Sequence, residues 1–235
     1  MDFKTNKKKA RLAGFLYFMV VVTGILNLAY IPSKLIEWNS AEATFNNISS
    51  NESLFRIGIL SGLICYTFFL LLPFALYNLL NPINKTAARL MVIFSVVSIP
   101  ISFLNFNHKF TVLRLLEKAN NLDGIHLYEI QEQILFSLQQ YNDGNQIASV
   151  FWGLWLFPFG YLVYKSGFLP KILGILLMFG CIGYLVNFTG NLLYPHYGET
   201  FLSNYIAKPG SIGEIGICLW LLIIGTKEKT KPTAL

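Results

Sequence analysis

Long apolar segments, separated by short polar connections, dominate this chain. A transmembrane helix needs about 20 predominantly apolar residues to cross roughly 30 Å of hydrocarbon. Six segments satisfy this condition: Leu12–Ile31, Leu54–Leu79, Ala87–Phe106, Ile147–Tyr164, Ile172–Leu193 and Pro209–Gly225. Because the rest of the chain is too short for a sizeable second domain, the pattern predicts an all-α, polytopic membrane protein with six transmembrane helices.

The polar segments set the expected boundaries. We expect a basic N-terminus at 1–11, a six-helix transmembrane domain at 12–226 and a polar tail at 227–235. Outer loops are expected at about 32–53, 107–146 and 194–208. Ser40 has the side chain to cap a short helix in the first of these loops.

The longest connection, 107–146, predicts a helical extracytoplasmic cap. Its first part keeps helical spacing and should extend the third span, and Asn120–Gly124 has the composition of a turn. A second amphipathic helix is expected next, with an apolar stripe formed by Leu127, Ile130, Ile134, Leu138 and Tyr141. Asn142-Asp143-Gly144 is expected to break or kink the chain before the fourth span.

Composition supports the membrane assignment. Of the 235 residues, 54% are hydrophobic and 13% charged, and the mean hydropathy is +0.52. Soluble domains carry about 25% charged residues, so this composition excludes a disordered chain, a nucleic-acid-binding domain and an ordinary cytosolic enzyme.

The charges predict an orientation with both termini in the cytoplasm. In that orientation twelve of the eighteen basic residues lie inside, and ten of the twelve acidic residues lie outside. Short loops rich in Lys and Arg stay on the cytoplasmic side. The net charge of +6 is therefore interpreted as a topology signal, and no nucleic-acid partner is predicted.

Polar side chains gather near the expected outer ends of the spans. Glu214 stands out, since an ionisable group inside a span is costly unless it is paired or hydrated. The residues form either an outward-facing polar pocket or a set of side chains that reach the outer interface, with Arg56–Glu214 at most a structural pair. The candidate pocket residues are Asn27, Arg56, His108, Asn187, Asn191 and Glu214.

Small residues mark expected helix contacts. Gly58 and Gly62, and Gly210 and Gly213, are spaced for close packing between membrane helices. The first and fifth spans also align at a constant offset, which pairs Gly14 with Gly174 and Asn27 with Asn187. This alignment is either an internal repeat or a chance likeness between apolar helices.

Motifs for catalysis and cofactor binding are weak or missing. Gly58–Gly62 resembles the serine motif of intramembrane proteases, but its spacing is one residue too long. The histidines lack ligand spacing such as HExxH, and the three cysteines lie alone within spans. We therefore predict no catalytic residue, metal site or cofactor. Enzyme activity is left open, although the missing motifs argue against it.

Several long stretches carry a family resemblance. They are GFLYFMVVVTGILNLAYIPSKLI, ESLFRIGILSGLICYTFFLLLPFALYNLLNPINK, FWGLWLFPFGYLVYKSGFLPKILGILL and SIGEIGICLWLLIIG. The chain resembles the domain of unknown function 4386 family of small bacterial membrane proteins, from about Leu12 to Gly225. The resemblance implies a multi-pass protein of the bacterial inner membrane and transfers no catalytic residues.

Three function classes follow. The first is binding or transport of a small or amphiphilic molecule through the outward-facing pocket. The second is a non-catalytic membrane partner or sensor subunit, and the third is an intramembrane enzyme. The lipid bilayer is an expected partner in each case, and a membrane protein partner is a further expectation of the second.

Overall fold

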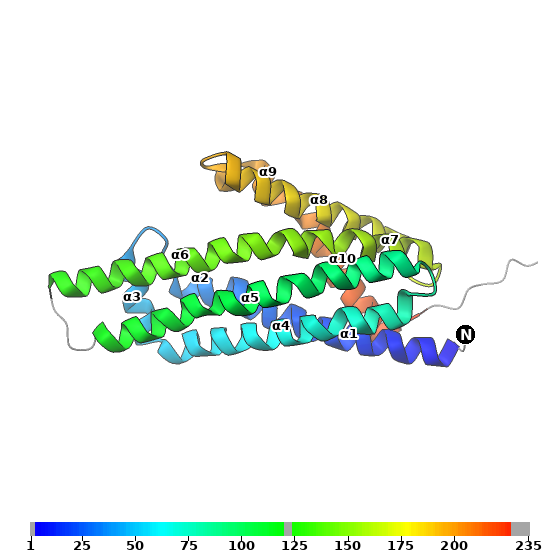
Figure 1. The fold of residues 1–235 in the computed structure, drawn as a ribbon, viewed down its shortest axis with the longest axis horizontal. Helices are drawn as coiled ribbons and strands as arrows, with labels where there is room; N and C mark the ends of the chain where they lie inside the picture. The colour runs from blue at the N-terminus through cyan, green and yellow to red at the C-terminus, as the bar shows by residue number, and fades with distance from the viewer. Residues whose placement is uncertain (1–2, 120–123, 227–235) are drawn as a thin grey trace, which may run out of the picture. The chain divides into compact units, whose positions relative to one another are not determined.

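The computed structural model describes residues 3–119 and 124–226, and in these ranges the regular secondary structure is helical and is joined by short turns and loops. Figure 1 shows the helices and their order. The elements are α1 (Phe3–Ile25), η1 (Leu26–Tyr30), α2 (Ile31–Leu35), α3 (Ala41–Ser50), α4 (Glu52–Leu80), α5 (Lys85–Ala119), α6 (Ile125–Leu154), α7 (Leu156–Ser166), α8 (Lys171–Leu193), η2 (Tyr197–Glu199), α9 (Phe201–Ile206), α10 (Lys208–Leu219) and η3 (Trp220–Ile224).

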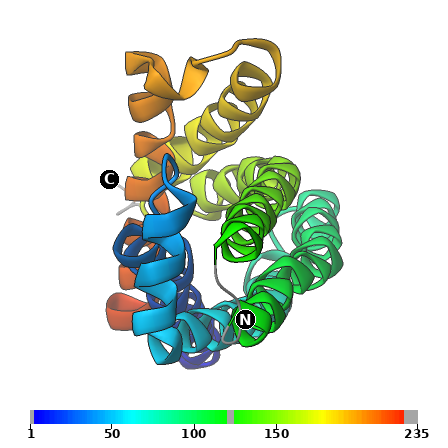
Figure 2. The same cartoon turned by 90° about the vertical axis from the view of Figure 1, so that its left-hand side faces the viewer.

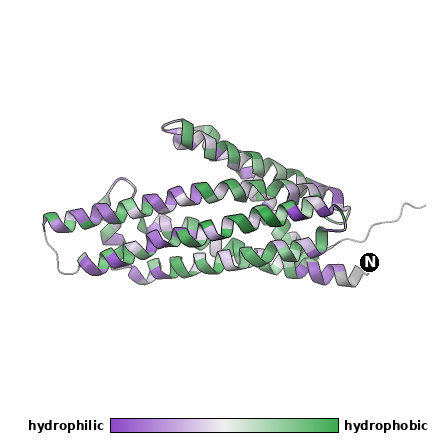
Figure 3. Ribbon diagram, in the orientation of Figure 1, coloured by the Kyte–Doolittle hydropathy of each residue, from purple (hydrophilic) through white to green (hydrophobic). Residues whose placement is uncertain are grey.

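Six helical segments of the described chain are long and apolar enough to cross a membrane, which confirms the predicted number. They are Asn6–Leu35, Glu52–Leu80, Lys85–Ala119, Ile125–Ser166, Lys171–Leu193 and Phe201–Ile224. In Figure 3 hydrophobic positions occupy much of these helices, and hydrophilic positions concentrate toward their ends. The protein is thus an all-helical, multi-pass membrane protein.

Two compact units make up the chain. Unit 1 comprises 1–19, 68–98 and 149–235, and unit 2 comprises 20–67 and 99–148. The long helices α1, α4, α5 and α6 contribute residues to both units, and each unit is described separately below.

In unit 1, helix α8 packs against both α7 and α10, and Figure 2 shows the chain returning from α8 through α9 to α10. Small residues allow these contacts. A Cβ on Gly160 would lie 2.5 Å from the carbonyl oxygen of Gly174, and a Cβ on Gly180 would lie 2.7 Å from the Cα of Gly210. Because backbone meets backbone at these points, a larger side chain would push the helices apart.

In unit 2, the connection between the third and fourth spans is built from the spans themselves. Helix α5 continues to Ala119, as predicted, and four of the five predicted stripe residues of α6 are buried, whereas Leu127 is half-buried. Residues 120–123 of the expected turn lie outside the described residues, whereas Gly124 has a positive φ of 62°. The predicted helical cap therefore consists of the ends of α5 and α6.

Of the two alternatives expected at Asn142–Gly144, the break is wrong, since α6 runs through these residues without interruption, and the kink stays a prediction. Gly144 faces the side chain of Asn105, and a Cβ at this position would collide with that amide. The glycine thus admits a neighbouring side chain rather than ending the helix. By contrast, Ser40 caps α3 as predicted, because its side chain accepts a hydrogen bond from the backbone N–H of Ala43 at 3.1 Å.

Candidate functional site

A buried polar cluster lies in unit 2, where η1, α5 and α6 meet. We call it the Lys109 centre, and it consists of Asn27, Asn105, Lys109, Tyr141 and Asn145. Lys109 is 4% exposed and Asn27 is 1% exposed. Since both side chains are polar and are buried on helical segments that are long and apolar enough to cross a membrane, their hydrogen-bond partners decide what the cluster can do.

The Lys109 ammonium has one oxygen partner in the described part of the chain. Its Nζ donates a hydrogen bond of 2.8 Å to Oδ1 of Asn27. The same nitrogen lies 4.1 Å from the ring centroid of Tyr141 and 5.6 Å from that of Phe106. Cation–π attraction of this kind contributes about 0.5–2 kcal/mol. Lys109 forms no ion pair with any described carboxylate.

Asn27 and Tyr141 complete one side of the centre. The amide nitrogen of Asn27 donates to the Tyr141 hydroxyl at 3.1 Å, and that hydroxyl lies 3.4 Å from Oδ1 of Asn27. Asn27 sits in η1, a single wide helical turn closed by the bond from the Ile31 N–H to the Leu26 carbonyl. Pro32 follows one residue later and has no N–H to donate, so regular α-helical bonding is interrupted here in any case. Such wide turns are frequent at functional sites.

Asn105 joins α5 to α6 on the other side. Its amide nitrogen donates to the backbone carbonyl of Tyr141 at 2.7 Å and to Oδ1 of Asn145 at 3.1 Å. Two glycines make room for the asparagines. A Cβ on Gly62 would lie 2.8 Å from Cγ of Asn27 and would also collide with Phe106, as one on Gly144 would collide with Asn105.

Unit 1 contains a second polar contact inside a span. The Tyr17 hydroxyl donates to Oε2 of Glu214 at 3.0 Å, and Glu214 is partly exposed. Beside it the aromatic rings of Tyr17, Trp155 and Phe159 pack together, with Trp155 and Phe159 stacked at 5.1 Å. Glu214 therefore has one phenol donor at the edge of an aromatic core.

The predicted pocket residues are divided between the units. Asn27, Arg56 and His108 belong to unit 2, and Asn187, Asn191 and Glu214 belong to unit 1. Arg56 is exposed and pairs with Glu52 one turn earlier at 2.6 Å, and His108 is half-buried.

The two remaining asparagines lie on α8. Asn187 accepts a hydrogen bond from the Tyr197 hydroxyl at 2.9 Å and donates to the Ser203 carbonyl at 3.3 Å. Asn191 is exposed. Of the six predicted residues, Asn27 is the one whose described partners include a buried lysine.

The predicted packing glycines all lie in close contacts. A Cβ on Gly58 would meet Ile31 at 3.1 Å, and one on Gly213 would meet Leu176 at 3.0 Å. Gly210 lies against Gly180, and Gly62 lies against Asn27. Gly62 therefore shapes the Lys109 centre as well as a helix contact.

Four of the five residues of the Lys109 centre are not among the predicted pocket residues: Asn105, Lys109, Tyr141 and Asn145. Lys109 was assigned to an outer loop, where a lysine is expected to be solvated. Its position on the buried face of α5 is visible in the spacing Phe106, Lys109, Val112 and Leu116, since residues three and four apart share one helix face.

The six apolar spans and the buried polar cluster define a multi-pass helical membrane protein. The chain matches the family described as "Domain of unknown function (DUF4386)" over residues 12–225, and it belongs to this family. It is also similar to an "Uncharacterized protein" from Archaeoglobus fulgidus, with 31% identity over 156 residues, covering 65% of this chain and 74% of the relative. No solved structure matches the chain.

Proposed function

We propose that this protein binds a small anionic or amphiphilic molecule at the Lys109 centre. The observation that carries the proposal is a buried lysine amino group with a single neutral oxygen partner and no carboxylate partner among the described residues. Burying an ionisable side chain without a charged partner is costly, which is why we take this lysine as the candidate binding site.

The chemistry of the ammonium favours an anionic group. A lysine ammonium has three protons to donate, and Asn27 accepts one of them. The nitrogen also faces the rings of Tyr141 and Phe106, which are weaker acceptors than an anionic oxygen. A carboxylate or phosphate that reached this nitrogen would therefore gain charge-assisted hydrogen bonds, and the rings would border the apolar part of an amphiphile.

A matched pair of probes tests this proposal. Dodecanoate and dodecanol have equal chain lengths but differ in charge. We expect dodecanoate to raise the thermal unfolding temperature of the purified protein in non-ionic detergent, and dodecanol to raise it less. The difference should vanish in Lys109→Gln and persist in Lys118→Gln, because Lys118 is exposed on the same helix. An equal response to both probes, or an unchanged response in Lys109→Gln, would overturn the proposal.

We propose further that the protein lies in a bacterial cytoplasmic membrane with both termini in the cytoplasm. The distribution of basic residues supports this orientation. A reporter that is active in the cytoplasm, fused after Thr226, should be active, and the matching periplasmic reporter should be silent. Periplasmic activity at this position would reverse the orientation.

A further inference from the structure

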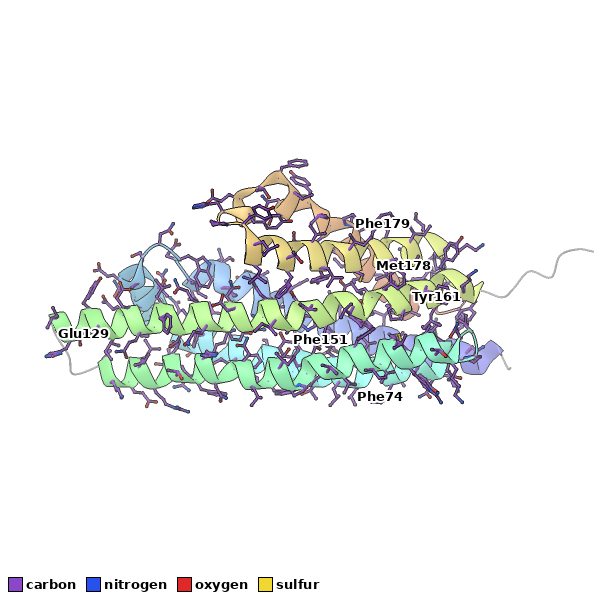
Figure 4. The ribbon with its side chains drawn as sticks, turned by 45° about the horizontal axis from the view of Figure 1, so that its top comes forward. Phe74, Glu129, Phe151, Tyr161, Met178 and Phe179 are labelled. Carbon is purple, nitrogen blue, oxygen red and sulfur yellow. The ribbon has the colours of Figure 1, made fainter. Side chains whose placement is uncertain are left out.

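A partly open groove of about 380 Å³ lies in unit 1, among α5, α6, α7 and α8. It is lined by Ala87, Leu90, Phe94, Leu154, Phe157, Pro158, Tyr161 and Cys181. Figure 4 labels Tyr161 on α7, beside Met178 on the neighbouring helix α8. Ligand sites range from about 300 to 1,000 Å³ and have mostly apolar walls, so the groove has the size and the lining of a binding site for a hydrocarbon.

The interruption between α6 and α7 forms one wall of the groove. Helix α6 ends at Leu154 and α7 begins at Leu156. Pro158 has no N–H to donate to the preceding turn, which is why proline interrupts the regular ladder of a helix. Leu154, Pro158 and Tyr161 are spaced by four and three residues and share one face. The groove therefore follows this face along the helix axis.

Basic residues gather at the end of the unit where this face emerges. Lys165 lies four residues after Tyr161 on the same face of α7, and Lys171 begins α8. Both ammonium groups approach the ring of Tyr164, at 5.9 Å and 5.6 Å from its centroid. Lys85 and Arg89 occupy the start of α5, and Figure 1 shows the α4–α5 and α7–α8 connections at the same end. We call these four exposed basic residues the basic end. They form no ion pair with a described carboxylate.

We propose that unit 1 binds one phospholipid with an anionic headgroup, with its phosphate at Lys165 and Lys171 and one acyl chain in the groove. Lys165 lies eleven positions after Leu154, which corresponds to about 16.5 Å along a helix at 1.5 Å per residue. In a phospholipid, a hydrocarbon chain that begins near the anionic headgroup can extend over such a distance, from Lys165 to the part of the groove beside Leu154. Positive charges near a membrane surface attract anionic lipids, and the groove adds a place for the chain that a surface charge alone does not supply. This site uses none of the residues of the Lys109 centre.

Native mass spectrometry of the purified protein tests the proposal. The protein is incubated with phosphatidylglycerol or with phosphatidylcholine of the same acyl chains, and the retained adducts are compared as collision energy rises. We expect a single phosphatidylglycerol adduct to persist at energies that remove phosphatidylcholine. The double variant Lys165→Gln/Lys171→Gln should lower retention of phosphatidylglycerol at least 5-fold. The control Arg114→Gln/Lys118→Gln removes two exposed charges near the C-terminal end of α5, in unit 2, and should leave retention of phosphatidylglycerol unchanged.

A second pair of variants isolates the groove. Leu90→Trp places a large side chain in its lining, whereas Ile93→Trp changes an exposed position on α5 outside the lining. Leu90→Trp should lower retention of phosphatidylglycerol at least 5-fold, and Ile93→Trp should leave it unchanged. Equal retention of both lipids, equal effects of the two tryptophan variants, or unchanged retention in the double lysine variant would each overturn the proposal. If this phospholipid proposal is overturned, the proposed binding site at the Lys109 centre still stands or falls by the dodecanoate experiment alone.

Discussion

Each unit holds an ionisable side chain on a helix that is long and apolar enough to cross a membrane, and the surroundings of the two side chains differ. In unit 2, Lys109 is 4% exposed and meets an amide oxygen and two aromatic rings. In unit 1, Glu214 is partly exposed and accepts one hydrogen bond from Tyr17. The two ionisable side chains thus differ in their exposure and in the chemical nature of their hydrogen-bond partners.

The largest expected effect comes from closing the space of the Lys109 centre. Gly62→Leu should lower the free energy of unfolding by about 3 kcal/mol or prevent folding, because its side chain would collide with Phe106 and Asn27. Unfolding by heat in detergent micelles measures this effect. Gly24→Ala is the control, since its Cβ would meet only Cys65 Sγ at 3.4 Å. An equal loss in both variants would show that any change at a glycine of these helices disrupts unit 2.

The next effect separates the lysine from its partner. Asn27→Ala leaves the buried ammonium of Lys109 without its oxygen acceptor and should cost about 3 kcal/mol in unfolding free energy. Lys109→Met removes the charge and should cost much less. The double variant Asn27→Ala/Lys109→Met should therefore be more stable than Asn27→Ala alone. Additive losses in this double-mutant cycle would contradict an energetic coupling between the two side chains.

A smaller effect is expected at the corresponding contact of unit 1. Tyr17→Phe removes the hydrogen bond to Glu214 and keeps the ring in the aromatic core, so we expect a loss of about 1 kcal/mol in thermal unfolding experiments. Tyr30→Phe serves as the control because Tyr30 is 51% exposed. A loss as large as that of Asn27→Ala would remove the contrast between the units.

The smallest effect is expected at Arg56. Its pair with Glu52 is exposed on both sides, and exposed pairs of this kind contribute about 0.3–0.5 kcal/mol. Arg56→Gln should therefore shift unfolding by no more than this amount, and less at high salt. A loss of unfolding free energy above about 1 kcal/mol would mean that Arg56 makes a contact that stabilises the protein more than its pair with Glu52 does.

The sequence predicted the parts of the fold that depend on local patterns. Apolar length predicted six spans, and Ser40 predicted the start of α3. The stripe from Leu127 to Tyr141 predicted the face of α6 that is buried from Ile130 onward. The break expected at Asn142–Gly144 is absent because turn-forming composition is a local signal. Gly144 instead makes room for the side chain of Asn105 on another helix.

The candidate site was predictable only in part. Asn27 was identified because an amide near the end of an apolar span is unusual. Lys109 was not, because basic residues near a span end usually stay solvated, and its burial depends on where α5 ends. Once α5 is extended to Ala119, the spacing of Phe106, Lys109 and Val112 places the lysine on a buried face. Its partners on η1 and α6 follow from tertiary packing, which no single segment encodes.

The wide turn at Leu26–Tyr30 behaves, in terms of the helix repeat, as one inserted residue. A residue advances an α-helix by about 100°, because 3.6 residues complete a turn. The side chains before and after the turn are therefore out of phase by roughly this angle, and the first span presents two different faces along its length. A relative with one residue fewer between Gly24 and Pro32 would have a single continuous helix face there. We therefore expect relatives that keep an asparagine at the position of Asn27 to keep the same number of residues in this segment.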